Sequence, residues 1–321
     1  MKDTILYGDC RQTLPAFIDN AQMCVTSPPY YGLRDYGGKS EQIGQEQTPE
    51  EYIEEMVNVF RLVRDNLKDD GVLWLNIGDT YYNYRSDGNY PKQTVSKTNQ
   101  DLPSFSPARG NKLEGLKSKD LIGIPWMLAF ALRADGWYLR QDIIWHKPNP
   151  MPESVKDRCT KAHEYIFLLS KSKNYYYDNE SIKEPAKDCG TRDRTNGKYH
   201  NEGTGLTPHS GLTKSYPTKN KRSFWSITNK PYKGSHFATF PPDLIEPCIL
   251  AGSRKGDIVL DPFMGSGTTA MVAKQLGRYY IGCELNEDYR KLIEKRVTVN
   301  KVEQNASHSE TNGLIDLLGT V

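Results

Sequence analysis

The sequence lacks long apolar runs, paired cysteines and an apolar segment near its first residue. Hydrophobic residues make up 37% of the 321 residues, the mean hydropathy is −0.69, and no stretch approaches the roughly 18 apolar residues that span a membrane. The six cysteines form no CxxC pair, which argues against a zinc site, and the length argues against a disulfide scaffold. Because no signal-peptide core is present, we expect a reduced, cytoplasmic protein without a metal.

Two nucleotide-binding signatures are also missing, since neither GxxxxGK[ST] nor GxGxxG occurs. Instead, an apolar strand runs through residues 257–261 into the glycine-rich turn 262–267, after which a helix is expected. Glycines let a backbone approach a ligand, and a helix start offers free N–H groups. The carboxylate of Asp261 beside this turn would repel a pyrophosphate but suits a cationic ligand such as S-adenosylmethionine. The next strand ends in Glu284, 19 residues after Gly265, near the spacing at which an acidic residue binds ribose hydroxyls.

A second motif follows the apolar strand 22–26, where Ser27, Pro28, Pro29 and Tyr30 come in sequence. The carboxyl ends of strands are where open α/β sheets bind ligands. Two prolines fix an extended backbone without N–H donors, which leaves carbonyl acceptors beside a serine hydroxyl. Two such acceptors can hold the hydrogens of an NH2 group and turn its lone pair toward a methyl donor. The ring of Tyr30 offers a flat face to a base.

The apolar periodicity predicts alternating strands and helices, which favours a doubly wound, mostly parallel α/β sheet. The helix at 49–68 carries the clearest start signals, because Thr48 can cap it and Glu51 can complete a capping box. Besides the elements already named, we expect strands at 4–7, 71–77, 137–146, 163–170 and 279–284, and helices at 121–134, 242–251 and 268–276.

Two basic, irregular segments interrupt this pattern. Residues 83–120 carry a net charge of +3, and residues 171–234 carry 13 Lys/Arg against 6 Asp/Glu, whereas the whole chain has a net charge of only +2. A basic island fits a module that faces a polyanion, although a solvated lysine-rich loop would have the same composition. The polar tail 301–321 is expected to fray.

Five stretches then carry a resemblance to a known family: 7–10 (YGDC), 26–30 (TSPPY), 143–149 (IIWHKPN), 236–241 (HFATFP) and 261–269 (DPFMGSGTT). Together they resemble the amino-group DNA methyltransferases, which methylate N4 of cytosine or N6 of adenine. The catalytic motif precedes the cofactor motif, an order typical of the family's β class. Release-factor glutamine methyltransferases also carry a PPY motif but place the cofactor loop first.

The resemblance implies a Rossmann-like fold of the S-adenosylmethionine methyltransferase type with an inserted recognition module. Its catalytic domain would comprise residues 1–170 and 235–300, with 83–120 as a loop insertion and 171–234 as the target-recognition region. S-adenosyl-L-methionine would be the cofactor. The residues implied to hold it are Asp9, Phe240, Pro241, Asp261, Pro262, Phe263, Gly265, Ser266, Gly267, Thr268, Thr269 and Glu284.

The same resemblance assigns catalysis to Ser27, Pro28, Pro29 and Tyr30, acting on a base that has left the duplex. Trp145 and Lys147 are expected to face that base. Candidate contacts to double-stranded DNA are Arg34, Arg192, Arg194, Lys214, Lys219, Lys221 and Arg222. A cognate restriction endonuclease and a homodimer are open possibilities for its partners, and no membrane is expected.

Several alternatives stand beside this interpretation. Serine at position 27 favours cytosine N4, whereas aspartate is more typical of adenine N6 members, so adenine is the second choice. Pro247-Cys248 matches the pair that 5-methylcytosine enzymes use as nucleophile, but it falls in a segment that resembles a core helix. A catalytically silent DNA-binding regulator would keep the fold, although the intact Ser27–Tyr30 motif and cofactor loop argue against it. Composition leaves RNA open as a substrate.

Overall fold

A computed structural model describes residues 1–17, 20–32, 42–82, 113–186, 217–229 and 240–298 of the chain. Eight strands in these residues form one sheet, in the spatial order β1-β10-β9-β2-β3-β5-β4-β8. Their bounds are β1 Thr4–Tyr7, β2 Ala21–Thr26, β3 Leu67–Ile77, β4 Tyr138–His146, β5 His163–Ser170, β8 Phe224–Ser226, β9 Ile258–Asp261 and β10 Tyr279–Glu284. The mixed, mostly parallel α/β fold that the sequence predicts is confirmed.

The direction of the strands decides which loops meet. Strands β1, β10, β9, β2 and β3 are parallel, and β5 runs antiparallel to both of its neighbours, β3 and β4. The carboxyl end of β4 and the amino end of β5 therefore lie at the same edge as the carboxyl ends of the parallel strands. From β2 the chain continues through β3 on one side, whereas β9 leads to β10 on the other. The crevice at such a reversal is where doubly wound sheets bind ligands.

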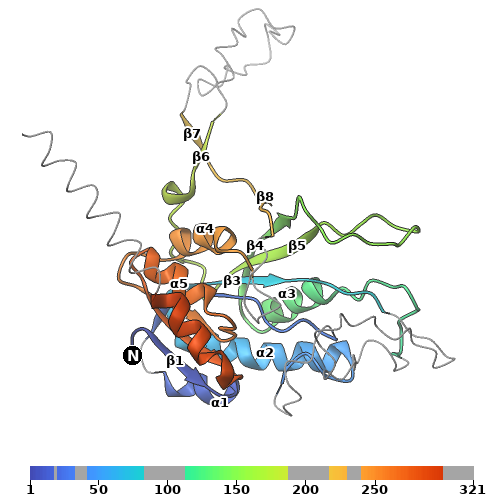
Figure 1. The fold of residues 1–321 in the computed structure, drawn as a ribbon, viewed down its shortest axis with the longest axis horizontal. Helices are drawn as coiled ribbons and strands as arrows, with labels where there is room; N and C mark the ends of the chain where they lie inside the picture. Colours follow the sequence, from blue (N-terminus) through green and yellow to red (C-terminus); the bar gives the residue numbers. More distant parts are fainter. Residues whose placement is uncertain (18–19, 33–41, 83–112, 187–216, 230–239, 299–321) are drawn as a thin grey trace, which may run out of the picture.

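Helices cover both faces of the sheet (Figure 1). One face carries α1 (Cys10–Thr13), α2 (Pro49–Asn66) and α3 (Ile124–Ala134), and the other carries α4 (Pro242–Gly252) and α5 (Thr268–Gln275). Residues alternate between the two cores along β3, so that Leu73 and Leu75 pack toward α2 and α3 while Val72 and Trp74 pack toward α4. No helix in the described residues is long and apolar enough to cross a membrane.

The start of α2 follows the sequence prediction. The Thr48 side chain accepts from the Glu51 backbone N–H, and the Glu51 carboxylate accepts in return from the Thr48 backbone N–H, which completes the capping box. By contrast, the helix predicted from residue 121 begins only at Ile124. Its N-cap Gly123 has φ +90°, and Leu121 forms a bridge with Tyr81 instead of a helical turn.

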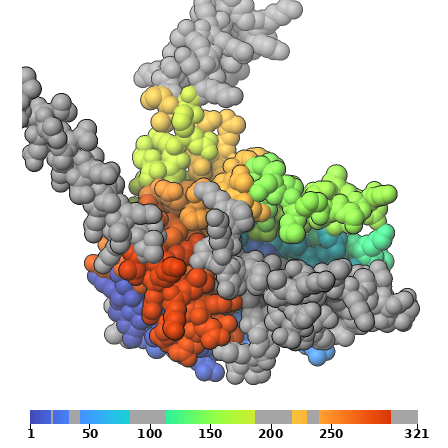
Figure 2. Space-filling model, viewed as in Figure 1, coloured from blue at the N-terminus to red at the C-terminus, as the bar shows by residue number. Residues whose placement is uncertain are grey.

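Part of the segment 171–234 is incorporated into the main sheet. Strand β8 pairs in parallel with β4, and Trp225 packs into the core beside Trp74, with the ring centroids 6.3 Å apart. A separate pair of short strands, β6 (Glu184–Pro185) and β7 (Thr218–Lys219), projects beyond α4 in Figures 1 and 2. Strand β8 thus belongs to the sheet that carries the site. A separate recognition module that ends at residue 234 stays a prediction.

Candidate functional site

The glycine-rich turn after β9 has the backbone that the sequence predicts. Gly265 and Gly267 have φ values of +54° and +80°, which side chains rarely tolerate. A Cβ on Gly267 would lie 2.9 Å from the Ile293 side chain, so the turn packs closely as well. The Gly265 N–H donates to Glu284 Oε2 at 2.7 Å, and Oε1 of the same carboxylate accepts from the Asn286 N–H at 2.8 Å. The turn and the acidic end of β10 thus form one surface.

Asp261, the last residue of β9, is 1% exposed and has protein partners on both oxygens. Thr26 Oγ1 and the Phe263 N–H donate to Oδ1 at 2.6 and 3.0 Å, and Thr269 Oγ1 donates to Oδ2 at 2.6 Å. Burial raises the pKa of this carboxyl to about 6, against the opposing effect of these hydrogen bonds. In the structure the carboxylate joins the residue before Ser27 to the helix after the glycine turn, and the contact of Asp261 with a cationic ligand stays a prediction.

The Ser27–Tyr30 motif follows the carboxyl end of β2, the strand that pairs with β9, and so lies at the same edge of the sheet as that turn. Ser27 Oγ donates to Tyr30 Oη at 3.4 Å. The Pro29 carbonyl accepts from Tyr52 Oη at 2.9 Å, which makes the Pro28 carbonyl the candidate acceptor for an incoming group. A Cβ on Gly78 would lie 2.6 Å from Tyr30 Cε2, so the tyrosine ring packs against the backbone that follows β3.

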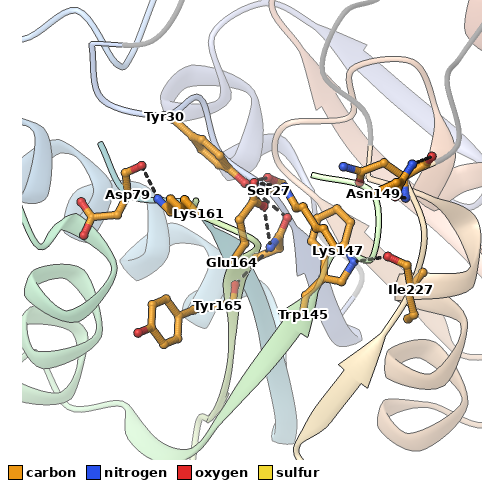
Figure 3. Close-up of polar contacts among 12 residues, drawn as sticks. Ser27, Tyr30, Asp79, Trp145, Lys147, Asn149, Lys161, Glu164, Tyr165 and Ile227 are labelled. Carbon is orange, nitrogen blue, oxygen red and sulfur yellow. Dashed lines mark hydrogen bonds and ion pairs between the residues drawn. The ribbon is translucent and has the colours of Figure 1, made fainter. Parts of the chain in front are cut away.

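A polar cluster that the sequence does not reveal lies behind Tyr30 (Figure 3). Tyr30 Oη donates to Glu164 Oε2 at 2.8 Å, and Asn76 Nδ2 lies 3.4 Å from the same oxygen. The ammonium of Lys147 forms an ion pair with Glu164 Oε1. These residues come from the ends of β3, β4 and β5, which only the strand directions bring together.

A second lysine borders this cluster. Lys161 Nζ donates to the Asp79 carbonyl at 2.5 Å, and burial lowers the pKa of Lys161. The Asp79 carboxylate accepts from the N–H groups of Gly123 and Ile124 at the start of α3, and burial raises its pKa despite those bonds. Asp79 therefore fixes the helix start beside the site.

The two residues predicted to face a base differ in their surroundings. Trp145 is 3% exposed, and its indole N–H donates to the Ile227 carbonyl at 2.9 Å. Lys147 Nζ lies 4.3 Å from the centre of the Trp145 ring. The Trp145 ring therefore packs against the Lys147 ammonium and does not offer an open face to a base.

Asp9 lies at the same edge as Glu284, because β1 pairs with β10 and the Gly8 N–H donates to the Glu284 carbonyl at 2.8 Å. Its carboxylate caps α1 through the Arg11 N–H at 2.9 Å and pairs with the Arg11 guanidinium at 2.7 Å. The carboxylate thus has protein partners already, and a role in holding an adenine edge stays a prediction.

Other predicted residues are spread over the structure. Phe240 packs against the core beneath α4, and Pro241 is the N-cap of that helix. Lys221 pairs with Glu184 at 3.5 Å, and Arg222, which is exposed, accepts at its carbonyl from the Trp225 indole at 2.7 Å. The predicted residues that lie outside the described ones are Arg34, Arg192, Arg194, Lys214 and His236.

Cys248, the cysteine of the Pro-Cys pair, lies within α4 and is 1% exposed. Its Sγ donates to the Leu244 carbonyl at 3.5 Å, and burial raises the pKa of the thiol. A thiol with a raised pKa in a helix core is a poor nucleophile.

Comparison with known proteins adds to this geometry. The model of the N6/N4 methyltransferase family, described as DNA methylase, matches residues 21–295. The Type II methyltransferase M.SmaI of Serratia marcescens is 50% identical over 294 residues, which cover 91% of this chain and 90% of that protein. M.Cfr9I of Citrobacter freundii is 46% identical over 288 residues, covering 89% of this chain and 84% of that one.

Solved structures share the fold. The PvuII DNA methyltransferase, described as cytosine-N4-specific, superimposes with a TM-score of 0.60 at 19% identity, covering 92% of this chain and 86% of that chain. M1.HpyAVI in complex with SAM superimposes with a TM-score of 0.52 at 18% identity, covering 91% of this chain and 98% of that chain.

Proposed function

The chain belongs to the N6/N4 family of DNA methylases, and from that premise we propose that it methylates N4 of a cytosine in duplex DNA. It is a DNA methyltransferase, and its curated relatives are Type II enzymes of restriction–modification. The observation that carries the proposal is that the Ser27–Tyr30 motif and the glycine turn follow the carboxyl ends of the neighbouring parallel strands β2 and β9, which the Thr26–Asp261 hydrogen bond of 2.6 Å joins.

The cofactor of this family is S-adenosyl-L-methionine, and the residues present fit it. Gly265 and Gly267 leave two positions of the turn without a side chain, and Glu284 adds an acceptor at the end of β10. We assign the methionine part of the donor to residues 261–269 and its ribose to Glu284. When bound, the cofactor supplies a methyl group on a positively charged sulfur.

The catalytic motif is assigned the target base. A base must first leave the duplex, at a cost of a few kcal/mol. Tyr30 then stacks on the base, while Ser27 Oγ and the Pro28 carbonyl each accept a hydrogen bond from the amino group of the base. These two acceptors turn the lone pair of the nitrogen out of the base plane, and most of the rate gain comes from this orientation. The proton released from nitrogen passes to water.

Serine at position 27 supports cytosine N4 as the target atom. The Ser27 hydroxyl can accept a hydrogen bond from an amino group while it donates its own hydrogen to Tyr30 Oη at 3.4 Å. Adenine N6 is the alternative product, because the same acceptors would hold its amino group. A silent DNA-binding regulator is the alternative of another class.

The DNA contacts and partners belong to the same proposal. Lys221 and the exposed Arg222 lie close to β8, which borders the site, and we assign them and Arg34 to DNA phosphates. Arg192 and Arg194 are assigned to guanines of the target sequence. A cognate restriction endonuclease and a cytoplasmic location fit the Type II relatives. A homodimer is a further proposal.

The product decides between these functions. Purified protein is incubated with S-adenosyl-L-methionine and unmodified duplex DNA of mixed sequence, which is then digested to nucleosides for mass spectrometry. The proposal predicts N4-methylcytosine. N6-methyladenine would overturn the choice of base but keep the chemistry, and the absence of any methylated base together with DNA binding would favour the regulator.

A further inference from the structure

The carboxylate of Glu164 is the common partner of two residues of the proposed site. Its Oε2 accepts from Tyr30 Oη at 2.8 Å, and its Oε1 holds the ammonium of Lys147 (Figure 3). Asn76 Nδ2 approaches Oε2 to 3.4 Å and also donates to the Tyr165 carbonyl at 3.1 Å. One carboxylate at the start of β5 thus connects the ends of β2, β3 and β4.

This group is largely removed from water. The side chains of Glu164 and Lys147 are 14% and 17% exposed, and Lys147 rests on the buried Trp145 ring. Surface ion pairs contribute little, but a partly buried carboxylate that loses a partner leaves an uncompensated charge. The Tyr30 hydroxyl and the Lys147 ammonium therefore both depend on the Glu164 carboxylate for their positions.

The ring of Tyr30 is confined from a second side. A Cβ on Gly78 would come within 2.6 Å of Tyr30 Cε2, so the backbone after β3 limits the ring plane. The hydroxyl end is held by Glu164, and Ser27 Oγ contacts the same hydroxyl at 3.4 Å. Any rotation of Tyr30 would thus disturb Ser27, which is the proposed acceptor for the target amino group.

We propose that Glu164 is a positioning residue for methyl transfer, which sets the Tyr30 ring and the Lys147 ammonium around the target base. Glu164 does not touch the reacting atoms in this assignment but acts through Tyr30 and Lys147. The inference rests on the proposed function. Because reaction rates depend steeply on the orientation of the bound base, loss of Glu164 lowers turnover. It spares the glycine turn after β9, because the Glu164 carboxylate bonds to Tyr30 and Lys147 instead.

A double-mutant cycle tests this role. Turnover, KM for DNA and the donor Kd from calorimetry are measured for the wild type, Glu164→Gln, Tyr30→Phe and the double variant. Glutamine keeps the shape of Glu164, but it places an NH2 donor where one of the two carboxylate oxygens accepts from Tyr30 or pairs with Lys147, and it carries no charge. We expect Glu164→Gln to lower kcat by about 10-fold or more, with the donor Kd changed by less than about threefold. In the Tyr30→Phe background the same substitution is expected to cost at least about threefold less, because the hydroxyl is gone.

Asp69→Asn is the matched control. Asp69 is also paired with a lysine, Lys171 at 3.9 Å, but its side chain is fully exposed and lies near the amino end of β3, away from the site. Its kcat is expected to stay within about twofold of the wild type. Thermal unfolding of each variant checks that it is folded.

Three results would overturn the inference: a Glu164→Gln enzyme with wild-type kcat, equal losses in kcat and donor affinity, or fully additive effects with Tyr30→Phe. Should Glu164→Gln not fold, Tyr30→Phe alone decides, because it keeps the ring and removes the same hydrogen bond. It must then lower kcat by about fivefold, and unchanged turnover would refute the role. A wild-type protein that methylates no DNA would instead refute the proposed function.

Discussion

Replacing Asp261 with asparagine is expected to change how stability depends on pH. Burial raises the pKa of Asp261 in the folded protein to about 6, from an ordinary 3.8. Between these values the folded state keeps a proton that the unfolded state has lost, so the stability due to this group is present below about pH 4 and lost as the pH rises through 6. At about 1.4 kcal/mol for each pKa unit, the loss approaches 3 kcal/mol.

Asparagine does not ionise, so Asp261→Asn escapes this loss. Its oxygen can accept from Thr26 and the Phe263 N–H, and its NH2 can donate to the Thr269 hydroxyl, so the substitution preserves the shape of the link. The assay is urea unfolding of both proteins at several pH values from 4.5 to 8. Asp69→Asn, at an exposed carboxylate, controls for the loss of one charge.

Between pH 4.5 and 8, the free energy of unfolding of Asp261→Asn minus that of the wild type is expected to rise by about 2 kcal/mol and to level off above pH 7. A difference that does not change with pH would refute the reasoning that burial dominates the ionisation of Asp261. A difference that falls with pH would show that the hydrogen bonds outweigh burial.

Three further predictions concern separate parts of the molecule. Gly78→Ala is expected to lower kcat by about 10-fold without changing the donor Kd, because its Cβ would lie 2.6 Å from Tyr30; calorimetry and turnover on the same sample check this, and normal turnover would contradict it. Glu284→Gln is expected to weaken donor binding by about 10-fold, because a charged acceptor is lost beside the Gly265 N–H, and an unchanged Kd would disprove the assignment. Thr48→Ala is expected to lower the free energy of unfolding by about 1 kcal/mol with normal kcat; a kcat several-fold below that of the wild type would contradict a purely structural role for this cap.

Local signals explain what the sequence could predict. The capping box at Thr48 and the glycine turn after β9 depend on neighbouring residues only, and both occur as expected. The Ser27–Tyr30 motif and the glycine turn lie at one edge of the sheet because the carboxyl ends of parallel strands meet there, and this follows from the alternation of strands and helices.

The partners of Asp261 and Glu164 could not be predicted in this way. Thr26 and Asp261 are 235 residues apart in the chain, and no local pattern pairs them. The carboxylate of Glu164 reaches Tyr30 only because β5 runs against β3, with its amino end at the edge that carries the site. The position of Trp145 in the core likewise depends on β8, which pairs with β4 in the sheet.

In the proposed function, the Ser27–Tyr30 motif performs the chemistry while the glycine turn after the neighbouring strand β9 binds the donor. The most direct test measures single-turnover methylation of DNA and the donor Kd on one preparation of Ser27→Ala. We expect the rate of Ser27→Ala to be at least about 100-fold below that of the wild type, with a donor Kd within about threefold of the wild-type value. An unchanged rate, or a rate and an affinity that fall by the same factor, would contradict it.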